Sequence, residues 1–212
     1  MENQEFKFKI RGKALICIDW ANVYGWQKGL DWKIDAQKLI KYLLDYSEIF
    51  KVNFYFGTDI TKKSQDFIVL LKQKENNRFS VITKNVKYVP VDLDKSYLKT
   101  RMAEIRQTFK NRNIKKEVVE ELDKMFLQPL ARRKCDFDVE IALDVLDNLD
   151  KFNTFILFSG DGDYAPLVEY CLKKQKQAVV VALPGSLGKE YLIISKKMYI
   201  CNVKKLRNFI GK

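Results

Sequence analysis

The stretch "FILFSGDGDYAP", residues 155–166, carries the clearest signal of the fold. Its apolar residues form a short pattern typical of a buried strand, and they lead directly into Asp161 and Asp163, which one glycine separates. The two glycines of the stretch allow the backbone to turn sharply, and Pro166 suits the first turn of a following helix. Carboxylates at such a turn could cap the helix, bind a metal ion or receive a phosphoryl group. The stretch predicts a strand–turn–helix unit and leaves its chemistry open.

Short apolar runs of the same kind recur along the chain. Together they predict strands at residues 13–20, 51–58, 78–86, 154–160 and 178–185. Apolar residues at helical spacing predict helices at 34–46 and 61–76, and the last two strands are each followed by a helical pattern. Near-continuous apolar strands that alternate with helices indicate an α/β fold whose parallel sheet is covered on both faces. Ligands of such sheets bind at the carboxyl ends of the strands.

The composition is that of a globular chain with an excess of positive charge. Of the 212 residues, 47% are hydrophobic and 31% are charged, and the net charge of +12 favours a nucleic-acid partner. We expect a cytoplasmic protein that does not enter a membrane, because the apolar runs are too short to span one and the first residues lack the apolar core of a secretory signal. The four cysteines are far apart and fit a reducing compartment.

The chain contains no histidine. This absence excludes Ser-His-Asp and Cys-His nucleophiles, ribonucleases with a histidine acid or base, and H-E-x-x-H zinc sites. Catalysis in this protein would therefore depend on carboxylates, amides, hydroxyls or lysine.

A long insertion separates the third and fourth predicted strands, at about residues 87–133. Apolar stripes from Leu98 to Phe109 and from Val118 to Phe126 predict two amphipathic helices. The segment is basic, since residues 87–134 hold 13 Lys or Arg against 7 Asp or Glu. We expect one domain over residues 1–212, with the insertion binding either a nucleic-acid backbone or a protein partner. The predicted nucleic-acid contacts are Lys99, Arg101, Arg106, Lys110, Arg112, Lys115, Lys116, Arg132, Arg133 and Lys134.

Acidic residues concentrate in the next part of the chain, where residues 133–163 hold 8 acids against 3 bases. Asp138 begins a predicted helix on its apolar side, so its carboxylate points inward, while Asp144 falls on the flank of that side. An inward carboxylate is costly unless it is paired or bound to a cation. Of the two aspartates that follow the fourth strand, Asp163 could cap the next helix, and Asp161 is the freer one.

Asp19 ends the first predicted strand, and Asn22 follows it three residues later. Asp19 could cap a turn or helix, or point into the crevice at the sheet edge. Because the carboxyl ends of parallel strands meet at one edge, we expect Asp19 to lie close to Asp138, Asp161 and Asp163. A carboxylate cluster repels itself when empty, and Mg²⁺ or Mn²⁺ prefer such oxygen ligands.

Three stretches resemble the NYN domains of the PIN-like nuclease superfamily, close to its LabA-like branch: "ICIDWANVYG", "DVEIALDVL" and "FILFSGDGDYAPLVEYCLKKQKQAVVVAL". The resemblance implies a three-layer α/β/α sandwich around a mostly parallel, Rossmann-like sheet. It also implies a divalent-metal-dependent ribonuclease. The family's motif positions carry over to Asp19, Asn22, Asp138, Asp161 and Asp163, with Asp144 as a further metal ligand.

The leading hypothesis is that Mg²⁺ or Mn²⁺, held by these carboxylates, assists hydrolysis of RNA phosphodiester bonds. A catalytically idle RNA-binding or assembly module is the alternative from another class, and a homo-oligomer is left open. A phosphatase of the haloacid dehalogenase type is a third hypothesis, because "SGDGD" is similar to the acidic loop of that family and Asp19 could be its nucleophile. Such enzymes need a second aspartate two residues after the nucleophile, where this chain has Ala21.

Overall fold

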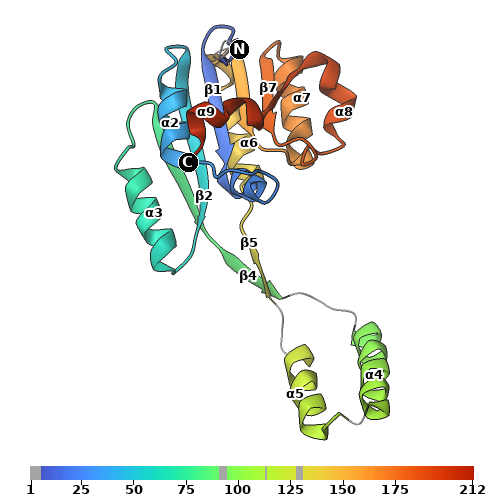
Figure 1. Cartoon of the computed structure of the whole chain (residues 1–212). Coiled ribbons are helices and arrows are strands. Elements are labelled where there is room, and N and C mark those ends of the chain that lie inside the picture. The colour runs from blue at the N-terminus through green and yellow to red at the C-terminus, as the bar shows by residue number, and fades with distance from the viewer. Residues whose placement is uncertain (1–5, 91–94, 113, 128–130) are drawn as a thin grey trace. The chain divides into compact units, whose positions relative to one another are not determined.

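The structure, a computed structural model, describes residues 6–90, 95–112, 114–127 and 131–212 (Figure 1). The chain divides into two compact units. The core unit comprises Met1–Asn85 and Asp136–Lys212, and the insertion unit comprises Val86–Cys135. The boundaries of the insertion unit lie within two residues of the predicted insertion.

The core unit contains a six-stranded sheet in which every neighbouring pair of strands is parallel. In spatial order its strands are β3 (Phe79–Asn85), β2 (Ile49–Thr58), β1 (Ala14–Asp19), β6 (Thr154–Phe158), β7 (Gln177–Ala182) and β8 (Tyr199–Asn202). The predicted parallel α/β sheet is confirmed, and β8 is an additional strand that the sequence analysis did not predict. The chain runs outward from β1 in one direction and from β6 in the other, so the strand order reverses between these two central strands. This reversal is the place where open parallel sheets bind ligands.

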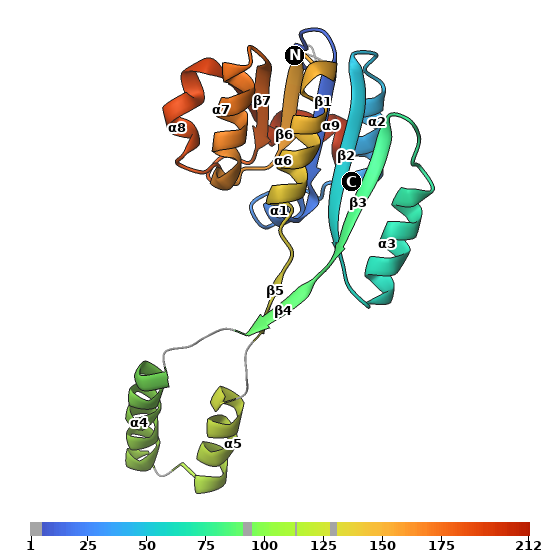
Figure 2. The same ribbon diagram turned by 180° about the vertical axis from the view of Figure 1, so that it is seen from behind.

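Helices cover both faces of the sheet (Figures 1 and 2). One face carries α1 (Trp20–Gly25), α2 (Ala36–Leu44), α3 (Lys62–Lys72) and α9 (Arg207–Ile210). The other face carries α6 (Asp138–Asp147) and α7 (Ala165–Lys173), which lie in front of the sheet in Figure 2, and the short α8 (Tyr191–Ile194) follows β7.

Alternation along β1 explains this layering. Ala14, Ile16 and Ile18 are fully buried in the core cluster shared with α1, α2 and α9. Leu15 and Cys17 are equally buried but point to the opposite face, because successive side chains of a strand alternate. A strand buried on both faces has a continuous apolar sequence, as residues 14–18 do. Asp19 interrupts the run at the point where β1 ends.

The insertion unit contains a two-stranded antiparallel ribbon and two helices. The ribbon pairs β4 (Lys87–Pro90) with β5 (Ala131–Lys134), and Lys87 lies opposite Lys134. The helices are α4 (Lys95–Asn111) and α5 (Lys116–Leu127), which confirm the two predicted amphipathic segments. The ribbon was not predicted.

Among the residues that the structure describes, no helix is both long enough and apolar enough to cross a membrane.

Candidate active site

The carboxyl ends of β1 and β6 place Asp19 next to the turn that follows β6. Asp19 is the N-cap of α1, and its Oδ1 accepts a hydrogen bond from the Asn22 backbone N at 3.3 Å. The hydroxyl of Ser159 donates to the other oxygen, Oδ2, at 3.5 Å. Asp19 therefore both starts α1 and faces β6. The sequence left these two roles open as alternatives, and the side chain has the geometry for both.

The side-chain amide of Asn22 connects α1 to the same turn. Its Oδ1 accepts from the Gly160 backbone N at 3.0 Å and from Trp26 Nε1 at 2.9 Å. Its Nδ2 donates no hydrogen bond to any residue within the described ranges. Asn22 thus holds the turn through its oxygen and keeps its nitrogen available to a ligand.

The turn after β6 is organised by Asp161 rather than by Asp163. Asp161 Oδ1 accepts from the Asp163 backbone N at 3.1 Å, which makes Asp161 the N-cap of a 3₁₀ turn, Gly162–Tyr164. Asp163 is exposed and caps no helix, so it does not take the capping role at α7 that its position in the sequence allowed. The physical reason is that the 3₁₀ turn intervenes before α7, and the capping position moves two residues back along the chain.

Asp138 is the first residue of α6 and is half-buried. Burial raises the pKa of its carboxyl, the neighbouring Tyr164 hydroxyl lowers it, and the negative charges of Asp136, Asp161 and Asp163 raise it further. Tyr164 itself is 2% exposed, and its hydroxyl makes no hydrogen bond of good geometry with any described residue. The hydroxyl lies near the Asp138 carboxylate and interacts with it electrostatically.

The carboxyl of Asp19 has a raised pKa as well. Burial raises its pKa from 3.8 to about 6, the Asn22 backbone N–H opposes this shift, and the charges of Asp161 and Asp138 add to it. Three carboxylates from three separate elements therefore act on one another. We call Asp19, Asp138 and Asp161 the edge carboxylates.

Asp144 is not among them. Its Oδ2 accepts from Tyr55 Oη at 2.5 Å and from Asn53 Nδ2 at 3.2 Å, both on β2. Asp144 lies six positions after Asp138 in the helix, which corresponds to about 9 Å along the helix axis. Asp144 serves a buried polar network inside the core unit, to which Cys17 Sγ contributes at 3.7 Å from Tyr55 Oη.

The donor chemistry at the sheet edge fits a hard divalent cation. The edge carboxylates offer only oxygen, and their mutual repulsion favours a bound positive charge. Within the described ranges, no three His, Cys, Asp or Glu side chains are close enough together to hold an ion. Mg²⁺ does not require such a cage, because it keeps several waters and binds through one or two carboxylates and the phosphates of a substrate.

Sequence reasoning did not assign roles to several residues around these carboxylates. Ser159 is fully buried, and its hydroxyl both contacts Asp19 and accepts from the Asp161 backbone N at 3.2 Å. Tyr191 Oη donates to the Asp161 carbonyl at 2.9 Å. Ser159 and Tyr164 belong to the quoted motif and could have been noticed there, whereas no signal marks Tyr191.

The predicted nucleic-acid contacts all lie in the insertion unit, and those whose side chains are described are exposed. These are Lys99, Arg101, Arg106, Lys110, Arg112, Lys115, Lys116 and Lys134. Arg101 pairs with Glu104 at 2.6 Å, and Lys116 pairs with Glu120 at 3.6 Å. Arg132 and Arg133 lie in β5, and their side chains are outside the described part of the structure.

Comparisons with known proteins agree with this fold. The chain is 23% identical over 200 residues to the "Low amplitude and bright protein LabA" of Synechococcus elongatus, a match that covers 94% of this chain and 88% of that protein. The crystal structure of a Vibrio parahaemolyticus protein of unknown function matches with a TM-score of 0.59 at 18% identity and covers 98% of this chain and 100% of that one. The family model of the NYN domain matches residues 13–200. The chain therefore belongs to the NYN family of PIN-like nucleases, as the sequence resemblance predicted.

Proposed function

We propose that this protein is a divalent-metal-dependent ribonuclease whose reaction centre is formed by the edge carboxylates. The observation that carries the proposal is the convergence of Asp19, Asp138 and Asp161 on one another, with the pKa of Asp19 raised to about 6. Perturbed carboxyls at the point where a parallel sheet reverses its strand order are typical of a reaction site. Membership of a nuclease family supports the same reaction class.

In this proposal one or two of the edge carboxylates Asp19, Asp138 and Asp161 bind Mg²⁺ or Mn²⁺, and waters and substrate phosphate complete its ligands. The exposed Asp163 lies beside them, and Asp144 is a more distant ligand candidate. The ion would polarise the phosphoryl group and supply an activated water. The chain's own residues do the positioning. Ser159 orients Asp19 and the Asp161 backbone, and the available Nδ2 of Asn22 donates to a phosphate oxygen.

The polymer is proposed to be RNA, with the exposed Lys and Arg of the insertion unit contacting its phosphates within a single domain. Such contacts are independent of sequence and weaken as salt rises. We propose the reducing cytoplasm as the place of the reaction, because the thiols of Cys17, Cys171 and Cys201 are buried and form no disulfide.

The test is a cleavage assay on single-stranded RNA, structured RNA and DNA, with Mg²⁺, Mn²⁺ or EDTA. Wild type is compared with Asp161→Asn, and Asp147→Asn is the matched control because Asp147 is an exposed aspartate at the end of α6. We expect RNA cleavage with either metal, none with EDTA, loss in Asp161→Asn and retention in Asp147→Asn. Equal cleavage in EDTA would contradict the metal mechanism. Salt-sensitive binding without cleavage would favour the idle RNA-binding module.

A further inference from the structure

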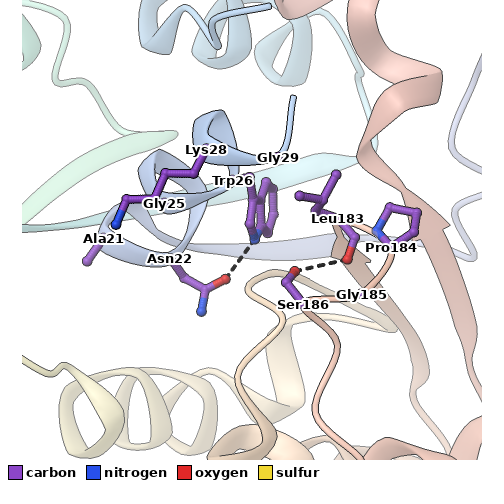
Figure 3. A pocket seen from close by; sticks show the side chains of 10 residues that line it. All are labelled: Ala21, Asn22, Gly25, Trp26, Lys28, Gly29, Leu183, Pro184, Gly185 and Ser186. Carbon is purple, nitrogen blue, oxygen red and sulfur yellow. Dashed lines mark hydrogen bonds between the residues drawn. The ribbon is translucent and has the colours of Figure 1, made fainter. Parts of the chain in front are cut away.

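A hollow of about 570 Å³ lies between α1 and the segment that follows β7 (Figure 3). One of its lining residues, Asn22, also contacts the edge carboxylate Asp19. The size of the hollow is that of pockets that take small organic ligands. Its walls are mostly apolar and include a few polar groups. The lining residues used below are Asn22, Gly25, Trp26, Lys28, Leu183 and Pro184.

Asn22 is shared between this hollow and the carboxylates. Its backbone N donates to Asp19, and its side-chain oxygen bonds the Gly160 N and the Trp26 indole. Two donors thus occupy the oxygen, and the amide nitrogen is left for a ligand at the border of the two regions (Figure 3). A nucleotide chain whose phosphate lay at the carboxylates would pass Asn22 and enter the hollow.

The walls suit a nucleobase. Trp26, 3% exposed, borders the hollow on one side, and Leu183, 9% exposed, and Pro184 border it on the other (Figure 3). A base has two flat faces that pack against apolar side chains and a polar edge that accepts hydrogen bonds. Lys28 is exposed at the rim, where its ammonium can reach a phosphate. The apolar wall suits a base, and the single cation beside it suits a phosphate, so together they match one nucleotide of a strand.

The backbone keeps the hollow open. A Cβ added at Gly25 would meet no atom within 4 Å, and the same holds at Gly185. The segment after β7 is held firmly, because a Cβ at Gly160 would lie 2.4 Å from the Ser186 carbonyl oxygen. The turn that carries Asp161 and the far wall of the hollow therefore pack directly together. A ligand in the hollow has a fixed position relative to the reaction centre.

We propose that this hollow is a nucleobase subsite that receives the base and ribose of a nucleotide adjoining the cleaved phosphate, with Lys28 binding that nucleotide's outer phosphate. The inference rests on the proposed ribonuclease function and adds to it a contact with one nucleotide of the substrate.

Gly25 allows a sharp test. It lies in the right-handed helical region, at φ −60° and ψ −31°, so a side chain there causes no backbone strain and points into open space. Gly25→Phe fills the hollow, and Gly25→Ala is the matched control that leaves it open. Both are made in the Asp161→Asn background with Mg²⁺, so that bound RNA is not cut. Ala21→Phe, at an exposed wall position on α1, is a second filling variant should Gly25→Phe melt early.

The probe is a short single-stranded RNA that carries the fluorescent base 2-aminopurine at one position at a time. We expect one position to change its emission on binding. Filling the hollow abolishes that change and weakens binding by about 10-fold, as loss of one stacked base does, whereas Gly25→Ala preserves both. An unchanged emission pattern and affinity in the filled variants overturns the subsite alone. No RNA binding by the Asp161→Asn parent or by wild type overturns the ribonuclease proposal together with it.

An abasic substrate gives an independent readout on the active enzyme. Removing the base at the responsive position should lower kcat/KM of wild type by about 10-fold and leave the already impaired Gly25→Phe enzyme unchanged. Fully additive losses would show that the base and the hollow do not interact, which overturns the subsite while RNA cleavage itself remains established.

Discussion

Two aspartates of α6, Asp138 and Asp144, lie in opposite surroundings. At its start, Asp138 lies with other carboxylates and beside a tyrosine hydroxyl that has no good hydrogen bond in the described structure. Farther along, Asp144 receives two side-chain hydrogen bonds from Tyr55 and Asn53. We refer to Asp144, Tyr55, Asn53 and Cys17 as the inner network.

This difference distinguishes carboxylates that are suited to bind a ligand from a carboxylate that stabilises the fold. A carboxylate with good donors stabilises the fold, whereas carboxylates that face one another destabilise it until a ligand compensates. The edge carboxylates should therefore control activity, and the inner network should control stability. Four experiments can break or sharpen this division.

The largest effect is expected from Asp138→Asn. Removing this charge should lower kcat/KM for RNA cleavage by about 1,000-fold, or about 4 kcal/mol in the activation barrier. The melting temperature should be unchanged or higher, because a repulsive charge is lost. Cleavage rates and thermal melts of the same preparation test both halves. A large drop in melting temperature would assign Asp138 to the scaffold instead.

Asp144→Ala should act in the opposite way. It leaves the Tyr55 hydroxyl and the Asn53 amide without their acceptor, and we expect a loss of about 3 kcal/mol in the free energy of unfolding. Urea denaturation measures this loss. Asp147→Ala is the control because Asp147 is exposed on the same helix and should change the free energy by less than about 0.5 kcal/mol. If the two variants were equally stable, the inner network would contribute nothing.

Asp19→Asn should stabilise the metal-free protein near neutral pH. Folding raises the pKa of Asp19 from 3.8 to about 6, so its contribution to stability is complete below pH 3.8 and is lost as the pH rises through 6. Asparagine has no such charge and caps helices as well as aspartate does. In EDTA we expect the variant to gain about 3 kcal/mol at pH 7.5 and nothing at pH 3.5. A gain that is independent of pH would contradict the electrostatic cause.

Tyr55→Phe should have the smallest effect. It removes one hydrogen bond to Asp144 and leaves the Asn53 bond in place. We expect a loss of about 1.5 kcal/mol in stability, measured by urea denaturation, and a turnover within about twofold of wild type. A loss of cleavage without a loss of stability would show that the inner network takes part in the reaction. It would contradict the division between edge carboxylates that control activity and an inner network that controls stability.

The sequence was sufficient for the strands that are buried on both faces. All five predicted strands appear in the structure. β1, β6 and β7 are apolar along their length because they are buried on both faces, whereas β2 and β3 are partly exposed. β8 was missed because it has four residues and lies at the sheet edge, where Tyr199 and Ile200 are partly exposed. The ribbon was missed because β4 and β5 are rich in polar and basic residues and have no strand-like apolar alternation.

For the candidate site, the sequence predicted which carboxylates share an edge better than it predicted their local roles. Asp161, and not Asp163, is the capping residue. The 3₁₀ turn that it caps has three residues, which is too short for a periodic pattern of apolar residues, so the sequence did not reveal the turn. Helical periodicity placed Asp144 on the flank of α6. Its partners, Asn53 and Tyr55, are 91 and 89 residues away along the chain, so no local pattern could identify them.

The ribbon has a consequence for how this family of chains can change. Lys87 and Lys134, near the two ends of the insertion unit, are directly paired in β4 and β5. The chain therefore leaves for the helices and returns from them at adjacent points. A change of length between Pro90 and Ala131 therefore need not alter the register of the six-stranded sheet. In this sense the insertion unit is a replaceable module, whose basic helices can change while the core unit keeps its fold.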